Sequence, residues 1–342
     1  MSAPGRPKGE YRSAQHAATP VSLLMNHEAA PAGRPKMSVC VITYNQERYI
    51  GQCLQSLVEQ KTDFDFEVIV GDDCSTDGTP AVVQEFVNRY PDIVRTILQP
   101  TNTGGSKNYL QVHAAAIGTY VAHVDGDDYA LPGKLQAQAE VLDADPACNA
   151  VWHRVDYFDD AGGFCSGRTA DWSSFEGGRV TFSDGIRLGF ISVHSSLMYR
   201  RAARTLLPVE QRTLDLYLTW DLLSKGHGRV VDEVLGRYRV ASSGSLTVAT
   251  QPGVLTLAIQ HADEFLTRFP ERRGDFMVWA LSRALVDAKN RRRTALNFLG
   301  LAWRARSLIS LSELAANLRL MRRTLVRWRQ QRQEQLSATP KG

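Results

Sequence analysis

The stretch that most constrains the fold is Gly118–Tyr129, an apolar run that ends abruptly in carboxylates. Asp125, Asp127 and Asp128 directly follow a strand's length of apolar and small side chains. A parallel strand buried on both faces has this composition, and open α/β sheets bind ligands beyond the carboxyl ends of such strands. Three neighbouring anions are stable when solvated, when they cap a helix, or when they share a divalent cation. A turn before the helix expected after Pro132 would favour the same residues.

Upstream of this run, segments with strand and helix patterns alternate. β-branched apolar runs predict strands, and amphipathic stretches predict helices. In chain order, the expected strands are 38–43, 66–70 and 94–98, and the expected helices are 47–60, 79–90 and 107–117. Thr79 and Pro80 place an N-cap and a first-turn proline at the second helix. This alternation implies βαβ crossovers, hence an α/β fold with a mostly parallel central sheet flanked by helices.

The rest of the chain is less regular up to about residue 254, and helical beyond it. The expected elements are a helix from Pro132 to about 142, strands at 150–158, 191–199 and 229–239, and a helix at 213–225. Breaks in the C-terminal helical region are expected near Pro270 and Gly300. We therefore divide the chain into a mobile tail at 1–36, an α/β domain at 37–250, a C-terminal helical extension at 251–335 and a short tail at 336–342.

Cysteine usage and hydropathy bear on the compartment. Five scattered cysteines without a Cys-x-x-Cys pair indicate neither a disulfide framework nor a zinc ribbon among the 342 residues. No apolar run approaches the ~20 residues of a membrane span. The basic N-terminus lacks a continuous apolar core, so no signal peptide is predicted. We expect a cytoplasmic protein.

Polar residues follow three of the predicted strands. Tyr44 and Asn45 follow the first strand, Asp72 and Asp73 the second, and Asp125 and Asp127 the fourth. An aromatic ring is suited to stacking on a base, and a carboxylate can accept the imide N–H of a uracil. Each pair also fits a turn that leads into a helix, or an N-cap. Because the carboxyl ends of parallel strands share one edge, we expect the three groups to lie together.

These segments, in this order and spacing, resemble the inverting glycosyltransferases of family two, which have the GT-A (Rossmann-like) fold. The resemblance covers residues 37–245. Its N-terminal part is carried by 41–47 (Val-Ile-Thr-Tyr-Asn-Gln-Glu), 72–79, 102–105 and 124–128. Further along, 213–218, Gly226 and 232–240 are similar to the family's acceptor-side region.

The resemblance implies a role for each residue at the strand ends. Tyr44 would stack on the nucleotide base, Asp73 would bind the base N3–H, and Asp125 would contact the ribose or support the metal site. Asp127 would bind Mn²⁺ or Mg²⁺, which bridges the donor pyrophosphate. Supporting roles fall to Asn45, Asp72 and Asp128. The implied donor is a nucleoside-diphosphate sugar, with a UDP-sugar as the first expectation. The implied acceptor is a glycan or a lipid-linked glycan.

Asp215 would be the general base on the acceptor side. A hydroxyl is a poor nucleophile, so a carboxylate within about 3 Å must take its proton. An Asp at this place is also an ordinary helix N-terminal residue, which the helix dipole favours. One departure concerns the Tyr-Arg-x-His that often follows the last strand in the family, because Ala241 stands at the histidine position. His194 lies where acceptor contacts would be expected, but a lone histidine is more often a hydrogen-bonded structural residue, and no acceptor role is assigned to it.

The C-terminal region is strongly basic. Residues 290–342 hold eleven Arg and one Lys against two Glu, whereas the whole chain has a net charge of only +4. One helical stripe of apolar residues runs through it, with Ser310 or Ser312 as N-cap: Leu311, Leu314, Leu318, Met321, Leu325 and Trp328. This helix can pack on its own domain, pair with a second copy, or lie on an anionic membrane surface with Trp303 and Trp328 near the headgroups. Nucleic-acid binding is not expected, because no known module accompanies the charge.

Two other classes were weighed. A dinucleotide-dependent oxidoreductase needs Gly-x-Gly-x-x-Gly after the first strand, where Thr43-Tyr44-Asn45 stands. A nucleotidyltransferase needs a Gly-rich phosphate loop and a Lys there. The remaining alternative is a non-catalytic scaffold of the same fold that binds a sugar nucleotide. Ala241, in place of the family's histidine, is consistent with this alternative. The presence of Asp125, Asp127 and Asp215 argues against it.

Overall fold

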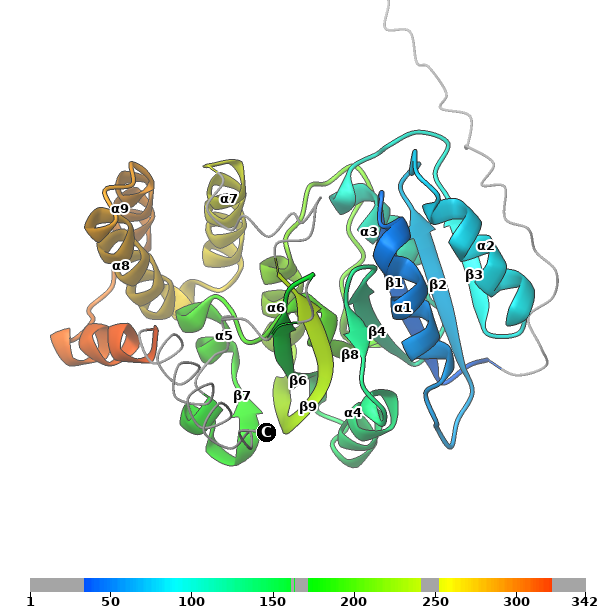
Figure 1. The fold of residues 1–342 in the computed structure, drawn as a ribbon. Coiled ribbons are helices and arrows are strands. Elements are labelled where there is room, and N and C mark those ends of the chain that lie inside the picture. The colour runs from blue at the N-terminus through cyan, green and yellow to red at the C-terminus, as the bar shows by residue number, and fades with distance from the viewer. Residues whose placement is uncertain (1–33, 161–162, 164–171, 241–251, 322–342) are drawn as a thin grey trace, which may run out of the picture.

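The chain was analysed as a computed structural model, which describes residues 34–160, 163, 172–240 and 252–321. A central β-sheet carries helices on both faces, and a group of C-terminal helices extends it on one side (Figure 1). Several expectations lie outside the described residues: the tail up to residue 33, Ala241 with the Ser242–Ser245 loop, and Leu325 and Trp328.

Nine strands of the described chain form one sheet. They are β1 (Met37–Thr43), β2 (Phe66–Asp72), β3 (Val94–Leu98), β4 (Tyr120–Asp125), β5 (Tyr129–Ala130), β6 (Cys148–Phe158), β7 (Arg179–Val180), β8 (Met198–Arg200) and β9 (His227–Arg239). The order is β3-β2-β1-β4-β8-β6-β9-β5, and β7 pairs with β9. The first four strands are parallel, as expected. Beyond β4 the sheet is mixed rather than mostly parallel, because β8, β5 and β7 run antiparallel to their neighbours.

The helices follow the strands in a regular order up to α4. They are α1 (Glu47–Val58), α2 (Thr79–Arg89), α3 (Gly105–Ala114), α4 (Lys134–Ala144), α5 (Phe182–Leu188), α6 (Asp215–Ser224), α7 (Pro252–Arg268), α8 (Arg273–Lys289) and α9 (Thr294–Ala305). The N-cap of α2 is Gly78 and not Thr79, because the Asp77 carboxylate accepts the Thr79 N–H (3.0 Å) and takes over the capping role. The strand expected at 191–199 is reduced to β8, since His194–Ser196 forms a 3₁₀ turn, η3.

Alternation of side chains along the strands divides the core into two layers. Met37, Val39 and Val41 of β1 face α1, α2 and α4, whereas Cys40 faces the other side. On that other side, α3, α5 and α6 cover the sheet, and their apolar cluster continues without a break into α7, α8 and α9. The C-terminal helices are therefore packed against the sheet domain through a shared core.

The breaks in the C-terminal helices were predicted in part. Pro270 begins the short turn between α7 and α8, as expected. The break expected near Gly300 is wrong: α9 runs through it. The chain leaves the helical conformation on either side instead, at 290–293, where Arg291 adopts a positive φ of 56°, and at 306–310. Ser310 caps the following helical segment by accepting the Glu313 N–H at 3.1 Å. None of the helices in the described part of the chain has the length and apolar character of a membrane span.

Candidate active site

The loops that follow β1, β2 and β4 lie side by side. In the parallel register, Thr43 is opposite Asp72 and Ile42 is opposite Asp125, so the three strands end on adjacent rungs. Two backbone bonds continue this alignment into the loops, from Asp73 N–H to the Thr43 carbonyl (3.1 Å) and from Gly126 N–H to the Ile42 carbonyl (2.9 Å). The predicted convergence of these strand ends is therefore present.

Asn45 and Asp72 tie two of these loops together. Asn45 has a φ of 51°, and its Oδ1 accepts the Thr76 N–H at 2.8 Å. Its own N–H donates to the Ser75 hydroxyl (2.9 Å), and that hydroxyl donates to Asp72. Between these anchors the Tyr44 side chain remains 42% exposed at the sheet edge. The ring is thus open to a planar ligand while its backbone is fixed.

Asp73 is buried and holds the turn before α3. Its Oδ1 accepts the Thr103 N–H (2.7 Å) and the Thr103 hydroxyl (2.8 Å), and its Oδ2 accepts the Gly104 N–H (2.8 Å). Gly104 has a φ of 84°, a conformation that favours glycine. A carboxylate oxygen accepts more than one hydrogen bond, so Oδ2 retains capacity for a further donor.

The carboxylates after β4 crowd one another. Asp128 is buried; it accepts the Ser195 hydroxyl and the Arg239 N–H (2.8 Å). Burial raises its pKa well above the usual range, and the neighbouring Asp127 and Asp125 raise it further. Burial likewise raises the pKa of Asp125. Asp127 is buried as well. A divalent cation would relieve this excess of negative charge.

Lys134 and Ser195 belong to the same cluster and were not anticipated from the sequence. Lys134 is almost completely buried under it, and its Nζ donates to the Ser195 carbonyl at 2.6 Å. Burial lowers its pKa to about 8, against the opposing effect of Cys53, Asp128 and Asp125. Ser195 also accepts the Asp125 N–H at 3.0 Å. A lysine at the start of an amphipathic helix and one serine of a Ser-Ser pair carry no signal in the sequence that would reveal this.

Arg239 contacts the loop that carries these carboxylates. It is buried, and its Nε donates to the Asp127 carbonyl at 3.1 Å. Its guanidinium lies 4.3 Å from the ring centroids of both Tyr49 and Phe158 and pairs with Asp160 at 3.0 Å. These residues line a polar cavity of about 320 Å³ that also includes Arg48, Gln52 and Arg237.

Asp215 is the first residue of α6 and is exposed. The preceding loop is anchored to α3, because the Ser106 hydroxyl donates to the Thr213 carbonyl (2.8 Å) and accepts the Thr213 N–H (3.1 Å). Burial lowers the pKa of His194 to about 3; the neighbouring His123 also lowers it, and the charges of Asp215 and Asp125 oppose this effect. Asp215 therefore begins α6 directly after a loop that α3 fixes in place.

A parallel sheet with polar loops at its carboxyl edge defines an α/β protein that binds its ligand at the strand ends. Residues 38–207 match the family described as Glycosyl transferase family 2. Together with the fold, this match places the chain in that family, with the GT-A fold.

Two curated relatives are similar to parts of this chain. The uncharacterized protein Rv1520 of Mycobacterium tuberculosis is 34% identical over 212 residues, 61% of this chain and 60% of the relative. The poly(ribitol-phosphate) β-N-acetylglucosaminyltransferase TarS of Staphylococcus aureus is 41% identical over 112 residues, 32% of this chain and 19% of TarS. The chain thus spans about three fifths or less of the length of these curated relatives.

Two solved structures share the fold. TarS residues 1–349 in complex with UDP-GlcNAc superpose with a TM-score of 0.61 at 24% identity, covering 86% of this chain and 92% of that one. The mannosyltransferase PcManGT of Pyrobaculum calidifontis, in complex with GDP-Man and Mn²⁺, superposes with a TM-score of 0.53 at 21% identity, covering 88% of each chain.

Proposed function

We propose that this protein transfers a sugar from a nucleoside-diphosphate sugar, UDP-linked in the first instance, to a hydroxyl of a glycan or lipid-linked acceptor. The observation that carries the proposal is the adjacency of the loops after β1, β2 and β4, which gathers Tyr44, Asp73 and Asp125 at one sheet edge. The match to the glycosyltransferase family supports the transfer of a sugar. The solved structures in complex with UDP-GlcNAc and GDP-Man support this class of donor.

In this proposal the nucleotide binds between Tyr44 and Asp73. The exposed Tyr44 ring stacks on the base, and Asp73 accepts the base N3–H with the capacity left on Oδ2. Asp125 contacts the ribose or supports the metal site. Asn45 and Asp72 act indirectly, since their hydrogen bonds hold the two loops in place.

The residues after β4 suit a hard divalent cation such as Mn²⁺ or Mg²⁺. Oxygen ligands are what these ions prefer. Burial raises the pKa of Asp128 and of Asp125, and the neighbouring carboxylates raise that of Asp128 further, so a bound cation would stabilise the charged forms. Asp127 would hold the ion, and Asp128 would support it. When bound, the ion would stabilise the negative charge on the departing nucleoside diphosphate. A neighbour described with Mn²⁺ supports this assignment.

Asp215 takes the proton from the acceptor hydroxyl. As an exposed carboxylate at the N-terminus of α6, it is favoured in its charged form by the helix dipole and accessible to an incoming molecule. Attack from the Asp215 side, with the leaving group held on the β4 side, inverts the anomeric carbon.

We further propose that the protein is cytoplasmic and associates with an anionic membrane surface through α9. Leu296, Leu299 and Trp303 are exposed at helical spacing along α9, Leu296 to 71% and Trp303 to 73%. Arg306 lies over the Trp303 ring at 5.7 Å. An amphipathic helix of this kind inserts its apolar face at the headgroup level, and basic residues beside that face, here Arg306, meet anionic lipids. A lipid-linked acceptor would be found at the same surface.

The test is the release of nucleoside diphosphate from a panel of UDP- and GDP-sugars, with Mn²⁺, with Mg²⁺ and with chelator. We expect release that requires the metal, is greatest with a UDP-sugar and increases with glycan acceptors. NMR of the product should show an inverted anomeric configuration. Binding of sugar nucleotides without turnover under any of these conditions would instead identify a non-catalytic scaffold.

A further inference from the structure

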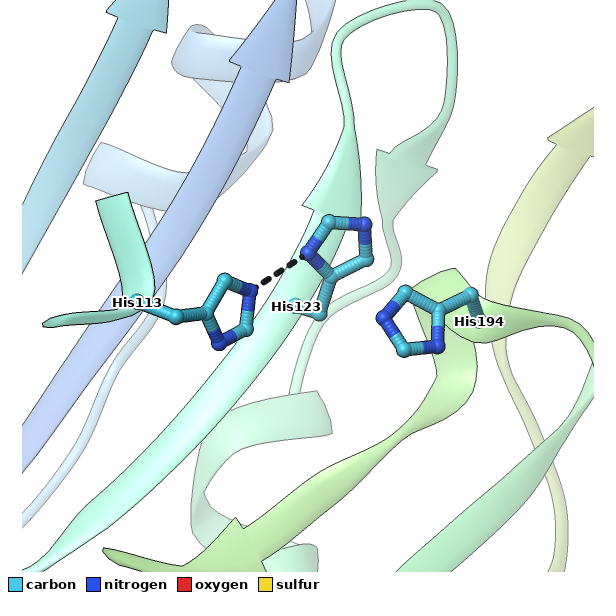
Figure 2. A group of neighbouring side chains, drawn as sticks. All are labelled: His113, His123 and His194. Carbon is cyan, nitrogen blue, oxygen red and sulfur yellow. Dashed lines mark hydrogen bonds between the residues drawn. The ribbon is translucent and has the colours of Figure 1, made fainter. Parts of the chain in front are cut away.

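Three histidines from separate elements meet behind the β4 carboxylates. His113 lies on α3, His123 on β4 and His194 on η3 (Figure 2). His113 and His123 are buried, and no step of the proposed transfer uses them. The His123 ring lies 5.1 Å from His113 and 4.1 Å from His194, centroid to centroid, and Tyr109 packs on His113 at 4.0 Å. The planes of these rings are thus fixed by packing.

A chain of hydrogen bonds runs through two of these histidines to Asp125. Arg204 Nη1 donates to the Tyr199 hydroxyl (3.3 Å), and that hydroxyl lies 2.8 Å from His113 Nδ1. His113 Nε2 is 3.0 Å from His123 Nδ1, and His123 Nε2 is 3.1 Å from Asp125 Oδ1. Apart from Asp125, which is 31% exposed, the chain from Tyr199 onward is buried.

The first donor determines the direction of every bond in this chain. A guanidinium only donates, so the Tyr199 oxygen accepts from Arg204 and its own proton remains to be donated. Within the described residues, His113 Nδ1 is the acceptor that this proton reaches. Burial lowers the pKa of His113 well below the usual range and that of His123 to about 3, so both rings are neutral and carry one N–H each. With Nδ1 accepting, each ring carries its proton on Nε2.

The last bond of the chain therefore donates to Asp125. We propose that His123, oriented by His113 and Tyr199, is a positioning residue that holds the Asp125 carboxylate in place for the sugar nucleotide, an inference that rests on the proposed function. His123 holds Oδ1 at 3.1 Å, the Ser195 hydroxyl lies 3.4 Å from Oδ2, and the side chain keeps 31% of its surface exposed. A carboxylate that is already fixed in one rotamer loses no rotamer freedom when the ligand binds, and this favours affinity.

A metal ion is the competing interpretation of this cluster, because one nitrogen from each of the three rings lies within 4.8 Å of the others. The facing nitrogens of His113 and His123 are at hydrogen-bond distance, and the tautomers derived above place a proton between them. A metal ion would need the lone pairs of both nitrogens. The donor direction therefore favours the hydrogen-bonded chain.

Two substitutions of His123 separate its two hydrogen bonds. The amide of His123→Gln reaches the place of Nε2 and keeps a donor for Asp125, whereas the shorter His123→Asn reaches only the place of Nδ1. The Kd for the sugar nucleotide is measured by calorimetry in the presence of Mn²⁺. It should rise about tenfold in His123→Asn, which corresponds to the loss of one charge-assisted hydrogen bond. It should rise no more than about threefold in His123→Gln. Equal losses in both variants would reduce His123 to a packing residue and overturn the proposal.

A second measurement does not depend on turnover or on the folding of a variant. In ¹⁵N-histidine-labelled protein, NMR should show His113 and His123 neutral, with the proton on Nε2. Protons on Nδ1 of both rings would mean that the hydrogen bonds run in the opposite direction. A stoichiometric transition metal in protein purified without added metal would mean that the histidines are metal ligands. Either result overturns the proposal. If the tautomers are as expected and the unmodified protein binds no sugar nucleotide, the proposed function fails instead.

Discussion

Asp127 and Asp128 are adjacent in sequence, and the proposed function gives them different roles. Asp128 accepts hydrogen bonds from Ser195 and from the Arg239 backbone, so its carboxylate is part of the loop's internal structure. Arg239 Nε donates to the Asp127 backbone carbonyl at 3.1 Å. The internal hydrogen bonds of Asp128 support the proposal that Asp128 is a supporting residue, and Asp127 is the proposed metal ligand.

Asp127→Ala should abolish the metal-dependent part of the thermal shift that a sugar nucleotide produces. A ligand at free concentration L stabilises the folded protein by RT ln(1 + L/Kd), so losing the metal removes the increment that the metal adds to sugar-nucleotide binding. The measurement compares melting temperatures with and without Mn²⁺ at fixed sugar nucleotide. Asp92→Ala, which removes an exposed carboxylate before β3, is the control and should retain the increment. An unchanged increment in Asp127→Ala would remove this residue from the metal site.

Asp215→Asn should leave the Kd for the sugar nucleotide unchanged and lower the rate of transfer by at least about 100-fold, because the amide cannot take the acceptor's proton. Calorimetry measures the first quantity and acceptor-dependent release of nucleoside diphosphate the second. Glu210→Gln removes a nearby exposed carboxylate and should behave as the unmodified protein. Transfer at the normal rate by Asp215→Asn would exclude Asp215 as the base.

At the site, the sequence predicts residues that a strand end or a motif places, and misses those that only the tertiary fold supplies. Tyr44, Asp73 and Asp125 follow buried strands, so the parallel register alone brings their loops together. Ser195 is 70 residues from Asp125 and reaches it from a 3₁₀ turn. Lys134 lies on a helix whose pattern predicts a solvated lysine. Neither position carries a local pattern that reports its contact.

Among the elements, those with a strong pattern were predicted best. β1, β2 and β3 agree with the expected strands within two residues. For β1 and β2 the reason is that buried parallel strands are nearly continuous apolar runs. α5 was missed, although its capping box, in which Thr181 accepts the Asp184 N–H and Asp184 accepts the Thr181 N–H, is a signal that the sequence contains. Gly300 failed as a break because glycine weakens a helix without ending it when packing holds both sides.

Asp145, at the end of α4, should make the free energy of unfolding depend on pH in the acid range. Hydrogen bonds from His227 (2.8 Å) and then Arg229 (3.1 Å) on β9 lower its pKa. A carboxylate with a lowered folded-state pKa contributes stability above its ordinary pKa of about 3.9 and loses it as pH falls through the folded value. Asp145→Asn should therefore be less stable at pH 7, by less than about 1 kcal/mol, and the difference should shrink below about pH 4. Urea unfolding at both pH values checks this; a pH-independent difference would contradict it.

α9 should bind anionic membranes through its apolar stripe. The unmodified protein should sediment with vesicles that contain phosphatidylglycerol and not with pure phosphatidylcholine vesicles, and added salt should weaken the binding. The double variant Leu296→Ser, Trp303→Ser should lose most of it. Leu285→Ser changes an exposed apolar residue on α8 and serves as the control. Binding that survives the double variant would contradict the role of α9, and a dimer that the double variant dissociates would assign the stripe to a second copy.

For the whole molecule, the pattern of strands and helices was sufficient to predict the α/β class, whereas the way in which the C-terminal helices join the sheet was not. A stripe of apolar residues indicates that a helix packs and does not indicate against what. Leu311, the first residue of the predicted stripe, is exposed, whereas Asn317 is buried, its amide donating to the Arg187 carbonyl (3.1 Å) and the Ser282 hydroxyl (3.0 Å). A polar residue buried through partners far away in sequence has no local signature.

Trp220 on α6 tests whether the sheet domain and the C-terminal helices unfold as one unit. It is fully buried, donates to the Gly185 carbonyl (2.9 Å), and packs edge-on against Phe265 of α7 and against Phe276 and Trp279 of α8, at 5.3–5.5 Å between centroids. Because the cavity would open in a core shared by both regions, Trp220→Ala should lower the free energy of unfolding by about 3–5 kcal/mol and leave a single calorimetric transition.

The control for this prediction is Trp303→Ala, which removes the same side chain from the surface of α9 and should change stability by no more than about 0.5 kcal/mol. Two separated transitions, with only one of them shifted by Trp220→Ala, would show that residues 37–250 and 251–335 unfold independently. In that case the shared apolar cluster would be an interface between two domains, and the boundary predicted near residue 250 would be a thermodynamic one as well.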